Sequence, residues 1–189
     1  MNIYRKKSLF GVLLLTLLFT LFLGCKKSER VYELLPPDPE PEVDITSLGT
    51  VSVNIENTGG AAAGEGSRKV VDNDLESKFL IFSYTPAFYI QLKFNKAQRV
   101  AAYTLTSAND ASDRDPKNWT ISGSDNGEQW VELDAQTDQS FTERGQTSRY
   151  DFANTKEYLY YRINITSIGK GSLFQLAEWR LIRKPLETQ

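Results

Sequence analysis

The chain has 189 residues, a formal net charge of −2, one cysteine and no histidine. The missing histidine excludes a histidine-based catalytic triad and a histidine-ligated zinc site. Without a basic patch interleaved with aromatic residues, nothing points to a nucleic-acid partner. A single cysteine forms no disulfide within the chain, and the length is enough for one domain with a sizeable core.

The first 25 residues have the pattern of an export signal. Three basic residues at positions 5–7 precede an apolar run at 9–23, which ends at Gly24-Cys25. A run of about 15 residues is shorter than the roughly 20 needed to cross a bilayer. A positive start, a short apolar stretch and small residues at the cut are typical of a secretory signal. We therefore predict that segment 1–24 is a signal peptide.

The residues Phe22-Leu23-Gly24-Cys25 resemble the lipobox of bacterial lipoproteins. The resemblance implies cleavage after Gly24 and lipid on Cys25, and several acyl chains give stable membrane anchoring. The mature chain would keep 189 − 24 = 165 residues and a net charge of −2 − 3 = −5, because segment 1–24 carries three positive charges and no negative one. Lys26 replaces the aspartate that resembles an inner-membrane retention signal, which favours the outer membrane of the bacterial envelope. The alternative is an ordinary signal peptide with a chance cysteine.

The mature chain is predicted to begin with a spacer. Residues 35–42 alternate proline with acidic residues, a composition that favours an extended polyproline conformation. Segment 25–45 is therefore expected to be a tether that holds a folded domain at 46–185 away from a membrane, and 186–189 is expected to be a tail.

From about residue 46 onward the sequence has the pattern of strands and turns. Runs rich in β-branched and aromatic residues alternate with period two, and Gly, Asn, Asp and Pro separate them. They lie at 50–55, 88–94, 100–107, 119–122, 130–133, 149–152, 159–165 and 176–182. No window of the mature domain has convincing helical periodicity. About eight strands without helices predict an all-β fold, an antiparallel β-sandwich or jelly roll.

Four segments resemble parts of discoidin domains, also called coagulation factor five/eight type C domains. They are the hairpin at 115–130, the acidic segment at 70–79, and two C-terminal strand segments at 160–163 and 175–178. They occur in the family's order and spacing, and the resemblance extends from about 47 to 184. It implies a galactose-binding-domain-like β-sandwich, similar to the family 32 carbohydrate-binding modules of bacterial glycan-degrading systems.

The acidic segment is a candidate metal site. Asp72, Asp74 and Ser77 offer several oxygens from one short loop, and Glu178 is an acid from a distant strand. Calcium prefers six to eight hard oxygen ligands, from carboxylates and backbone carbonyls of flexible loops. The spacing therefore suits a calcium ion.

The resemblance to discoidin domains implies a structural calcium ion at the same place. It adds the backbone carbonyls of Lys69 and Ala177 to the side chains of Asp72 and Glu178, and the ion would fix loops rather than catalyse a reaction. The residues alone leave another interpretation open, in which nearby cations neutralise an acidic turn. The candidate cations are Lys69, Lys78 and Arg180.

The loop at 108–116 is a candidate ligand-binding loop. In sugar-binding relatives the corresponding loop contacts the ligand through Arg and Asn, which here are Arg114 and Asn109, with Asp110 beside them. Groups that donate and accept hydrogen bonds suit vicinal hydroxyls. Alternatively, Asp110 or Asp113 pairs with Arg114 and only braces the loop.

Aromatic residues at 82–86 and before the last strand are candidate sugar platforms. Tyr84 falls where relatives often place a histidine or an aromatic ring against the sugar, and its ring can stack on a pyranose. The absence of histidine there argues against galactose specificity. Phe174 is a similar candidate, with core packing as the alternative. Trp119 and Trp130 are expected to pack in the core or the hairpin. For Trp179 the sequence leaves open which face of its strand the side chain occupies.

These features together predict a non-catalytic glycan-binding module on a bacterial cell-envelope lipoprotein, active in glycan capture or utilisation. The alternative is a protein-interaction or assembly subunit of an envelope complex. An enzyme is disfavoured. The acids Asp113 and Asp115 are two residues apart in a loop expected to be exposed, without an activated nucleophile nearby.

Overall fold

The computed structural model describes residues 41–185 of the chain. Cys25, the predicted signal peptide 1–24, most of the predicted tether and the tail at 186–189 lie outside the described residues. Within the described part, no helix is long and apolar enough to cross a membrane.

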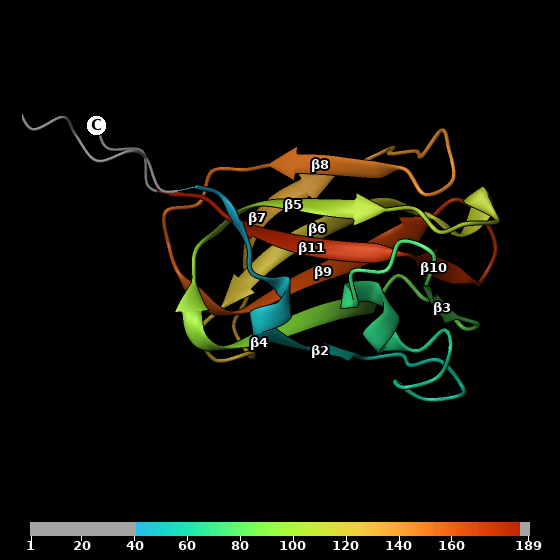
Figure 1. Cartoon of the computed structure of the whole chain (residues 1–189), viewed down its shortest axis with the longest axis horizontal. Helices are drawn as coiled ribbons and strands as arrows, with labels where there is room; N and C mark the ends of the chain where they lie inside the picture. The colour runs from blue at the N-terminus through green and yellow to red at the C-terminus, as the bar shows by residue number, and fades with distance from the viewer. Residues whose placement is uncertain (1–40, 186–189) are drawn as a thin grey trace, which may run out of the picture. The chain divides into compact units, whose positions relative to one another are not determined.

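The described residues form a β-sandwich (Figure 1). A five-stranded sheet has the order β2 (Gly49–Val53), β4 (Phe88–Gln98), β9 (Tyr158–Ile168), β6 (Pro116–Ser124), β7 (Val131–Gln136). A four-stranded sheet has the order β1 (Val43–Asp44), β11 (Glu178–Arg183), β5 (Val100–Thr106), β8 (Thr147–Asp151). A third pair joins β10 (Phe174–Leu176) to β3 (Phe79–Ile81).

Every strand pair is antiparallel, which confirms the predicted all-β antiparallel fold. The core lies between the two large sheets, as strand β4 illustrates. Phe88, Ile90 and Leu92 are fully buried, while Tyr89 and Gln91 between them are only half-buried. Alternation along a strand sends successive side chains to opposite faces, so one face builds the core. Trp119 and Trp179 are both buried in that core.

Three expectations about the fold need correction. The sandwich begins before residue 46, because Val43 pairs with Arg183 and Ile45 is 1% exposed. The short strands β1 and β3 were not predicted, since two or three residues are too few to show a period-two pattern. The run predicted as one strand at 176–182 is divided between β10 and β11. Short 3-10 helices also occur, at η2 (Thr46–Leu48), η3 (Ser67–Val71) and η4 (Ser112–Arg114).

Three connections meet at one end of the sandwich, which we call the loop end. They are the β3–β4 connection (82–87), the β5–β6 connection (107–115) and the β9–β10 connection (169–173). Backbone hydrogen bonds join them: Tyr84 N donates to Ser172 O at 2.8 Å, and Lys170 N donates to Asp113 O at 2.6 Å. The predicted ligand-binding loop and the predicted aromatic turn therefore belong to one surface.

Candidate functional site

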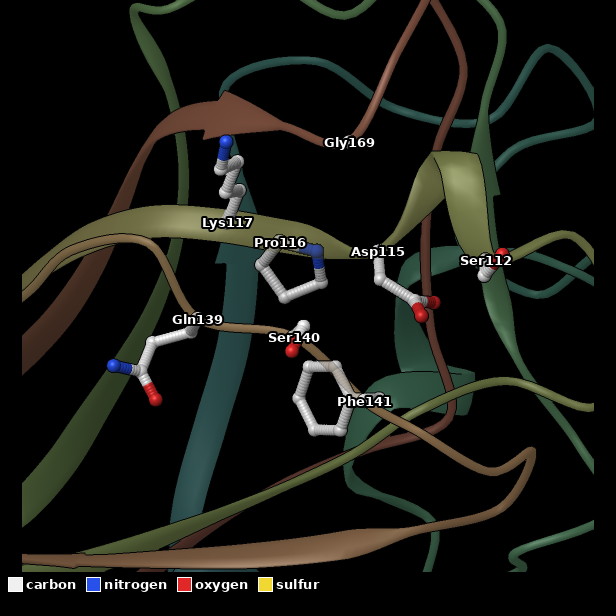
Figure 2. Close-up of a pocket in the computed structure, with 8 residues that line it drawn as sticks. All are labelled: Ser112, Asp115, Pro116, Lys117, Gln139, Ser140, Phe141 and Gly169. Carbon is white, nitrogen blue, oxygen red and sulfur yellow. The ribbon is translucent and has the colours of Figure 1, made fainter.

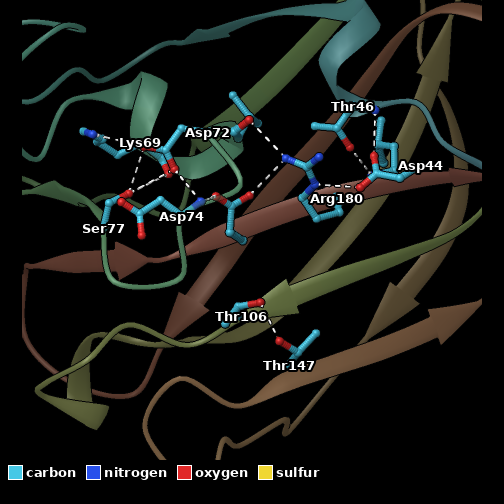
Figure 3. Close-up of polar contacts among 12 residues, drawn as sticks. Asp44, Thr46, Lys69, Asp72, Asp74, Ser77, Thr106, Thr147 and Arg180 are labelled. Atoms are coloured by element: carbon cyan, nitrogen blue, oxygen red, sulfur yellow. Dashed lines mark hydrogen bonds and ion pairs between the residues drawn. The ribbon is translucent and has the colours of Figure 1, made fainter.

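The residues predicted to hold calcium lie together around one acidic cluster (Figure 3). Ser77 Oγ lies 3.0 Å from both carboxylate oxygens of Asp72 and 3.5 Å from the carbonyl oxygen of Lys69. The amide of Asp74 donates to Asp72 Oδ1 at 3.1 Å and to Glu178 Oε1 at 3.2 Å. The loop thus brings its oxygens against β11, 104 residues away in sequence.

Asn73 makes this loop geometry possible. Its φ is +64°, a left-handed conformation that asparagine tolerates better than most residues. Asp74 takes part through its amide, while its side-chain Oδ1 accepts from the amide of Glu76 at 3.0 Å. Ala177 lies buried between β10 and β11, and its amide donates to Thr106 O at 3.0 Å.

The two carboxyl groups of the cluster have opposite pKa shifts. Burial of Glu178, which is 1% exposed, raises its pKa to about 7, and its contact with Asp72 adds to the rise. For Asp72, burial is outweighed by hydrogen bonds from Lys69, Asp74 and Ser77, and its pKa is lowered. One carboxylate of the cluster therefore carries a negative charge at neutral pH, while the other is close to its titration midpoint.

Lys69 and Arg180 partly neutralise the cluster. Lys69 Nζ lies 3.0 Å from Asp72 Oδ2, and Arg180 Nη1 lies 3.3 Å from Glu178 Oε2. Arg180 also donates from Nε to Asp44 at 2.8 Å and from Nη1 to the carbonyl of Val71 at 3.1 Å.

Both sequence interpretations of the cluster therefore have structural counterparts. Among residues 41–185, no three acidic side chains come close enough to hold a metal ion on their own. A bound cation here would need the Ser77 hydroxyl and backbone carbonyls in addition to Asp72 and Glu178. Lys78, the third candidate counter-ion, pairs with Asp110 at the loop end instead.

At the loop end, two cations from other elements brace the predicted ligand-binding loop. Lys78 Nζ lies 2.6 Å from Asp110 Oδ2 and donates to Asn109 Oδ1 at 3.3 Å. Arg144 makes a two-pronged pair with Asp115, at 3.0 Å and 2.5 Å, and also donates to the carbonyl of Asp110 at 3.0 Å. Sequence reasoning missed Arg144, because no local pattern connects residues 29 positions apart.

Asp115 is a buried member of this network, 5% exposed. Burial raises its pKa, even though the ion pair with Arg144 acts in the opposite direction. The expectation that Asp113 and Asp115 both lie in an exposed loop is therefore wrong for Asp115. Its carboxylate is occupied by the Arg144 guanidinium.

Arg114 is left comparatively free by these braces. Its side chain is 32% exposed, and its Nη1 lies 3.9 Å from Asp110 Oδ2, a long ion pair. Asn109 is exposed on the same loop. The structure therefore brings Arg114, Asn109 and Asp110 together, as the sequence predicted, and assigns the stronger bracing contacts to Lys78 and Arg144.

The two predicted aromatic platforms differ from expectation. Phe174 is fully buried, and its ring packs 4.9 Å from Phe88 and 6.3 Å from Phe79, centroid to centroid. The prediction that Phe174 contacts a ligand is wrong, because strand β10 turns the ring into the core. Tyr84 is half-buried over this aromatic cluster, and its hydroxyl donates to Ile165 O at 3.1 Å. Phe82, which belongs to the aromatic segment predicted at 82–86, is 50% exposed in the same connection.

A pocket of about 330 Å³ opens beside the braced loop (Figure 2). Its walls come from η4, the start of β6, and a segment that precedes β8. The lining residues are Ser112, Asp115, Pro116, Lys117, Gln139, Ser140, Phe141 and Gly169. A Cβ on Gly169 would lie 2.8 Å from the carbonyl oxygen of Asp113, so only glycine lets these two connections approach so closely. The pocket combines polar groups with the Phe141 and Pro116 rings, a mixture that suits small polar ligands.

The chain is similar to a curated protein, a peptide-N(4)-(N-acetyl-beta-glucosaminyl)asparagine amidase from Arabidopsis thaliana. It is 50% identical over 95 residues, which are 48% of this chain. The matched part is only 13% of that protein's length. The similarity therefore concerns one segment of a much longer enzyme.

Two solved bacterial structures illustrate the similarity of fold. The F5/8 type C domain of a Bacteroides fragilis protein has a TM-score of 0.64 and 17% identity, over 79% of this chain and all of that one. The family 32 carbohydrate-binding module of Clostridium perfringens NanJ, solved with galactose, has a TM-score of 0.59 and 15% identity. It covers 76% of this chain and all of that one.

The family model named F5/8 type C domain matches residues 50–179. This range runs from β2 into β11 and includes the acidic cluster and the loop end. The protein therefore belongs to the F5/8 type C (discoidin) domain family.

Proposed function

We propose that this domain is a non-catalytic glycan-binding module and that its ligand binds at the loop end. One observation carries the proposal. Lys78 and Arg144 already brace the loop at 108–116, so the guanidinium of Arg114 is not needed for that task. The Arg114 side chain stays one-third exposed on the loop that also carries Asn109. A partly exposed arginine fork and the amide of an exposed asparagine suit pairs of sugar hydroxyls.

The comparisons support a sugar as the ligand class. The chain belongs to the F5/8 type C family, and a solved module of similar fold holds galactose. Binding through a shallow polar rim with few aromatic contacts is weak. We expect dissociation constants of roughly 0.1–1 mM, which correspond to about −4 to −5.5 kcal/mol. The chain lacks histidine, which argues for a sugar other than galactose.

A binding role without catalysis is supported by the acids of the loop. Asp115 is buried, and its carboxylate is paired with Arg144. Asp113 and Asp115 therefore do not form the pair of available carboxyl groups that acid–base hydrolysis of a glycoside needs. The amidase of similar sequence is matched over 13% of its length, so its activity is not carried over to this chain.

We further propose that the acidic cluster binds a structural calcium ion. The Ser77 hydroxyl lies within 3.5 Å of both the Asp72 carboxylate and the Lys69 carbonyl oxygen. The Glu178 carboxylate accepts a hydrogen bond from the same loop. All are hard oxygens of the kind that calcium prefers. When bound, the ion would tie the loop at 72–77 to β11. The two other predicted ligands, the Asp74 side chain and the Ala177 backbone carbonyl, belong to residues at the border of the cluster.

The proposed setting is the bacterial cell envelope, with Cys25 lipid-anchored and the outer membrane favoured. The lipobox-like sequence and the alternating prolines and acids at 35–42 support this setting. A module on such a tether would concentrate glycans near the enzymes that degrade them.

A glycan array with the full chain and calcium present tests the proposed function. We expect a small set of glycans to bind and Arg114→Ala to remove their signal. Silence across bacterial, animal and plant glycans would contradict glycan binding. Recovery of one stoichiometric protein from membranes, together with such silence, would favour an assembly subunit.

A further inference from the structure

The outer face of the five-stranded sheet carries a second concentration of aromatic and polar side chains, away from the loop end. We define this outer face by the outward-pointing residues of β4, β9 and β6 and by Trp130 just before β7. In the central strand β9, Arg162 lies opposite Gln91 on β4 and Ser122 on β6. The members used below are Tyr89, Gln91, Lys93, Trp130, Arg162 and Asn164.

Arg162 is held between two aromatic rings at the middle of this face. Its guanidinium carbon lies 3.8 Å from the ring centroid of Tyr89 and 3.8 Å from that of Trp130. Gln91 Oε1 accepts from its Nε at 3.3 Å and from its Nη2 at 2.8 Å. The side chain is therefore fixed in orientation, and within the described residues its Nη1 makes no hydrogen bond.

This cation has no acidic partner among residues 41–185, although the residue is half-buried. Burial accordingly lowers the pKa of its guanidinium. The opposite sheet is built differently, because Arg149 on β8 pairs with both Glu42 at 2.8 Å and Asp151 at 3.0 Å. Arg149 on the four-stranded sheet is thus neutralised by acidic residues, whereas Arg162 on the five-stranded sheet has no acidic partner among the described residues.

The groups around Arg162 are those that recognise sugars. Asn164 donates to Thr120 Oγ1 at 3.0 Å, which orients its amide along the sheet surface. Lys93 is exposed, and its Nζ lies 5.6 Å from the Tyr160 ring. The large exposed hydrophobic side chains of the described chain are Val43, Leu48, Leu75, Phe82 and Val131, and none belongs to the outer face. A protein interface usually has an apolar core, whereas amides, hydroxyls and aromatic rings suit a carbohydrate.

We propose that the outer face is a second binding site, which takes a hexuronate unit of an acidic polysaccharide. The sugar carboxylate would accept from Arg162, and Asn164 and Lys93 would contact neighbouring hydroxyl or carboxylate groups along the chain. An arginine with fixed geometry is suited to a planar carboxylate. This site lies on other elements than the loop end and does not depend on the function proposed there.

The charge on the sugar can be tested with a matched pair of polymers. Polygalacturonate and its methyl-esterified form share a backbone, and only the first has free carboxylates. We expect the full chain to bind polygalacturonate at least tenfold more tightly in affinity electrophoresis, and Arg162→Gln to remove the preference. Arg149→Gln removes one positive charge from the opposite sheet and should change affinity by less than twofold. Equal binding of both polymers, or equal losses in the two variants, would overturn the proposal.

Two further variants separate this site from the loop end and from loss of folding. Lys93→Gln changes an exposed side chain and is expected to weaken polygalacturonate binding two- to fivefold at an unchanged melting temperature. Arg114→Ala should leave polygalacturonate binding intact. If Arg114→Ala abolished it while Arg162→Gln did not, the acidic sugar would bind at the loop end and the outer-face site would be wrong.

Tryptophan fluorescence gives an independent readout of position. The chain has three tryptophans, and Trp119 and Trp179 are buried. Quenching by acrylamide therefore reports mainly on Trp130, which is half-exposed beside Arg162. Polygalacturonate should protect the wild-type chain from quenching and have no such effect on Trp130→Phe. Unprotected fluorescence at saturating polymer would place the ligand elsewhere and contradict the proposal.

Discussion

Arg180 Nη1 lies 3.3 Å from Glu178 Oε2, and the Glu178 carboxyl nevertheless keeps a pKa raised to about 7. Burial is the main cause, because the residue is 1% exposed and its charged form loses hydration. Arg180 compensates only in part, since the same guanidinium also serves Asp44 and the carbonyl of Val71. This relationship makes the stability of the cluster depend on pH.

In chelator, we expect the free energy of unfolding to fall as the pH rises from about 4.5 to about 7. In that window the folded state keeps a proton on Glu178 that the unfolded state, with the ordinary pKa of 4.5, has already released. A tenfold change in a protonation constant corresponds to about 1.4 kcal/mol, so the loss is on the order of 1–3 kcal/mol. Urea unfolding at several pH values measures it.

Glu178→Gln is the control for this titration, because glutamine has nearly the same shape and no titrating group. Its stability should change much less over the same pH range. An equally steep dependence in Glu178→Gln would assign the effect to another group.

Calcium should stabilise the wild-type chain against unfolding. A ligand that binds only the folded state adds about 2.7 kcal/mol at one hundred times its dissociation constant. Asp72→Ala should abolish the increase in melting temperature, because it removes the carboxylate on which Ser77 and Lys69 converge. Asp113→Ala, an acid outside the cluster, should retain it. Identical melting curves with calcium and with chelator would contradict the metal site.

The sandwich could be predicted from the sequence because alternation along each strand is a local pattern. The acidic cluster could be predicted because the family resemblance connects residues that are distant in the sequence. Strands such as β4 and β9 have 11 residues each, and their alternation is visible without coordinates. The acidic cluster needs Asp72, Ser77 and Glu178 to meet, which follows from the resemblance rather than from spacing alone. The predicted starts of β4 and β9 are within one residue of those observed, whereas the two strands end four and three residues later than predicted.

The details of the loop end could not be read in the same way. Arg144 supports Asp115 from 29 residues away, and no periodicity encodes that contact. Whether an aromatic ring faces solvent depends on which face of the strand its residue occupies, and a strand of three residues is too short to show this in the sequence. Tyr84, Phe82 and Phe174 look equivalent in the sequence, yet their surroundings differ. Only Phe174 is completely buried, in the three-residue strand β10.

Phe174→Ala should therefore affect folding and not a ligand contact. Removal of a fully buried phenylalanine typically costs about 3–5 kcal/mol, from lost burial and the cavity left behind. Phe82→Ala, at the 50% exposed position, should change stability little. Chemical denaturation of both variants checks the difference. A stable Phe174→Ala chain with lost glycan binding would restore the platform interpretation.

Cys25→Ala should release the protein from the membrane fraction or block cleavage of the signal. Without the thiol there is no attachment point for the diacylglyceryl group, and the chain has no other cysteine. Fractionation of cells that express the wild type and the variant measures the outcome. Ser28→Ala, close to the same site, should fractionate like the wild type. Normal retention of Cys25→Ala would contradict the lipid anchor.

The last prediction separates ligand contact from bracing at the loop end. Arg114 has one long ion pair and a side chain that is 32% exposed, so Arg114→Ala should leave the melting temperature nearly unchanged. If its guanidinium contacts the glycan, the same change should weaken binding by roughly 1–3 kcal/mol, the cost of an unpaired polar partner. Arg144→Ala, in contrast, should lower the melting temperature. It removes the two-pronged partner of Asp115, which is 5% exposed, and should lower the free energy of unfolding by about 1–3 kcal/mol. Glycan affinity and melting temperature are measured for both variants at the same calcium concentration. If Arg114→Ala lowered the melting temperature as much as Arg144→Ala and left affinity intact, Arg114 would be a brace and the glycan would bind elsewhere.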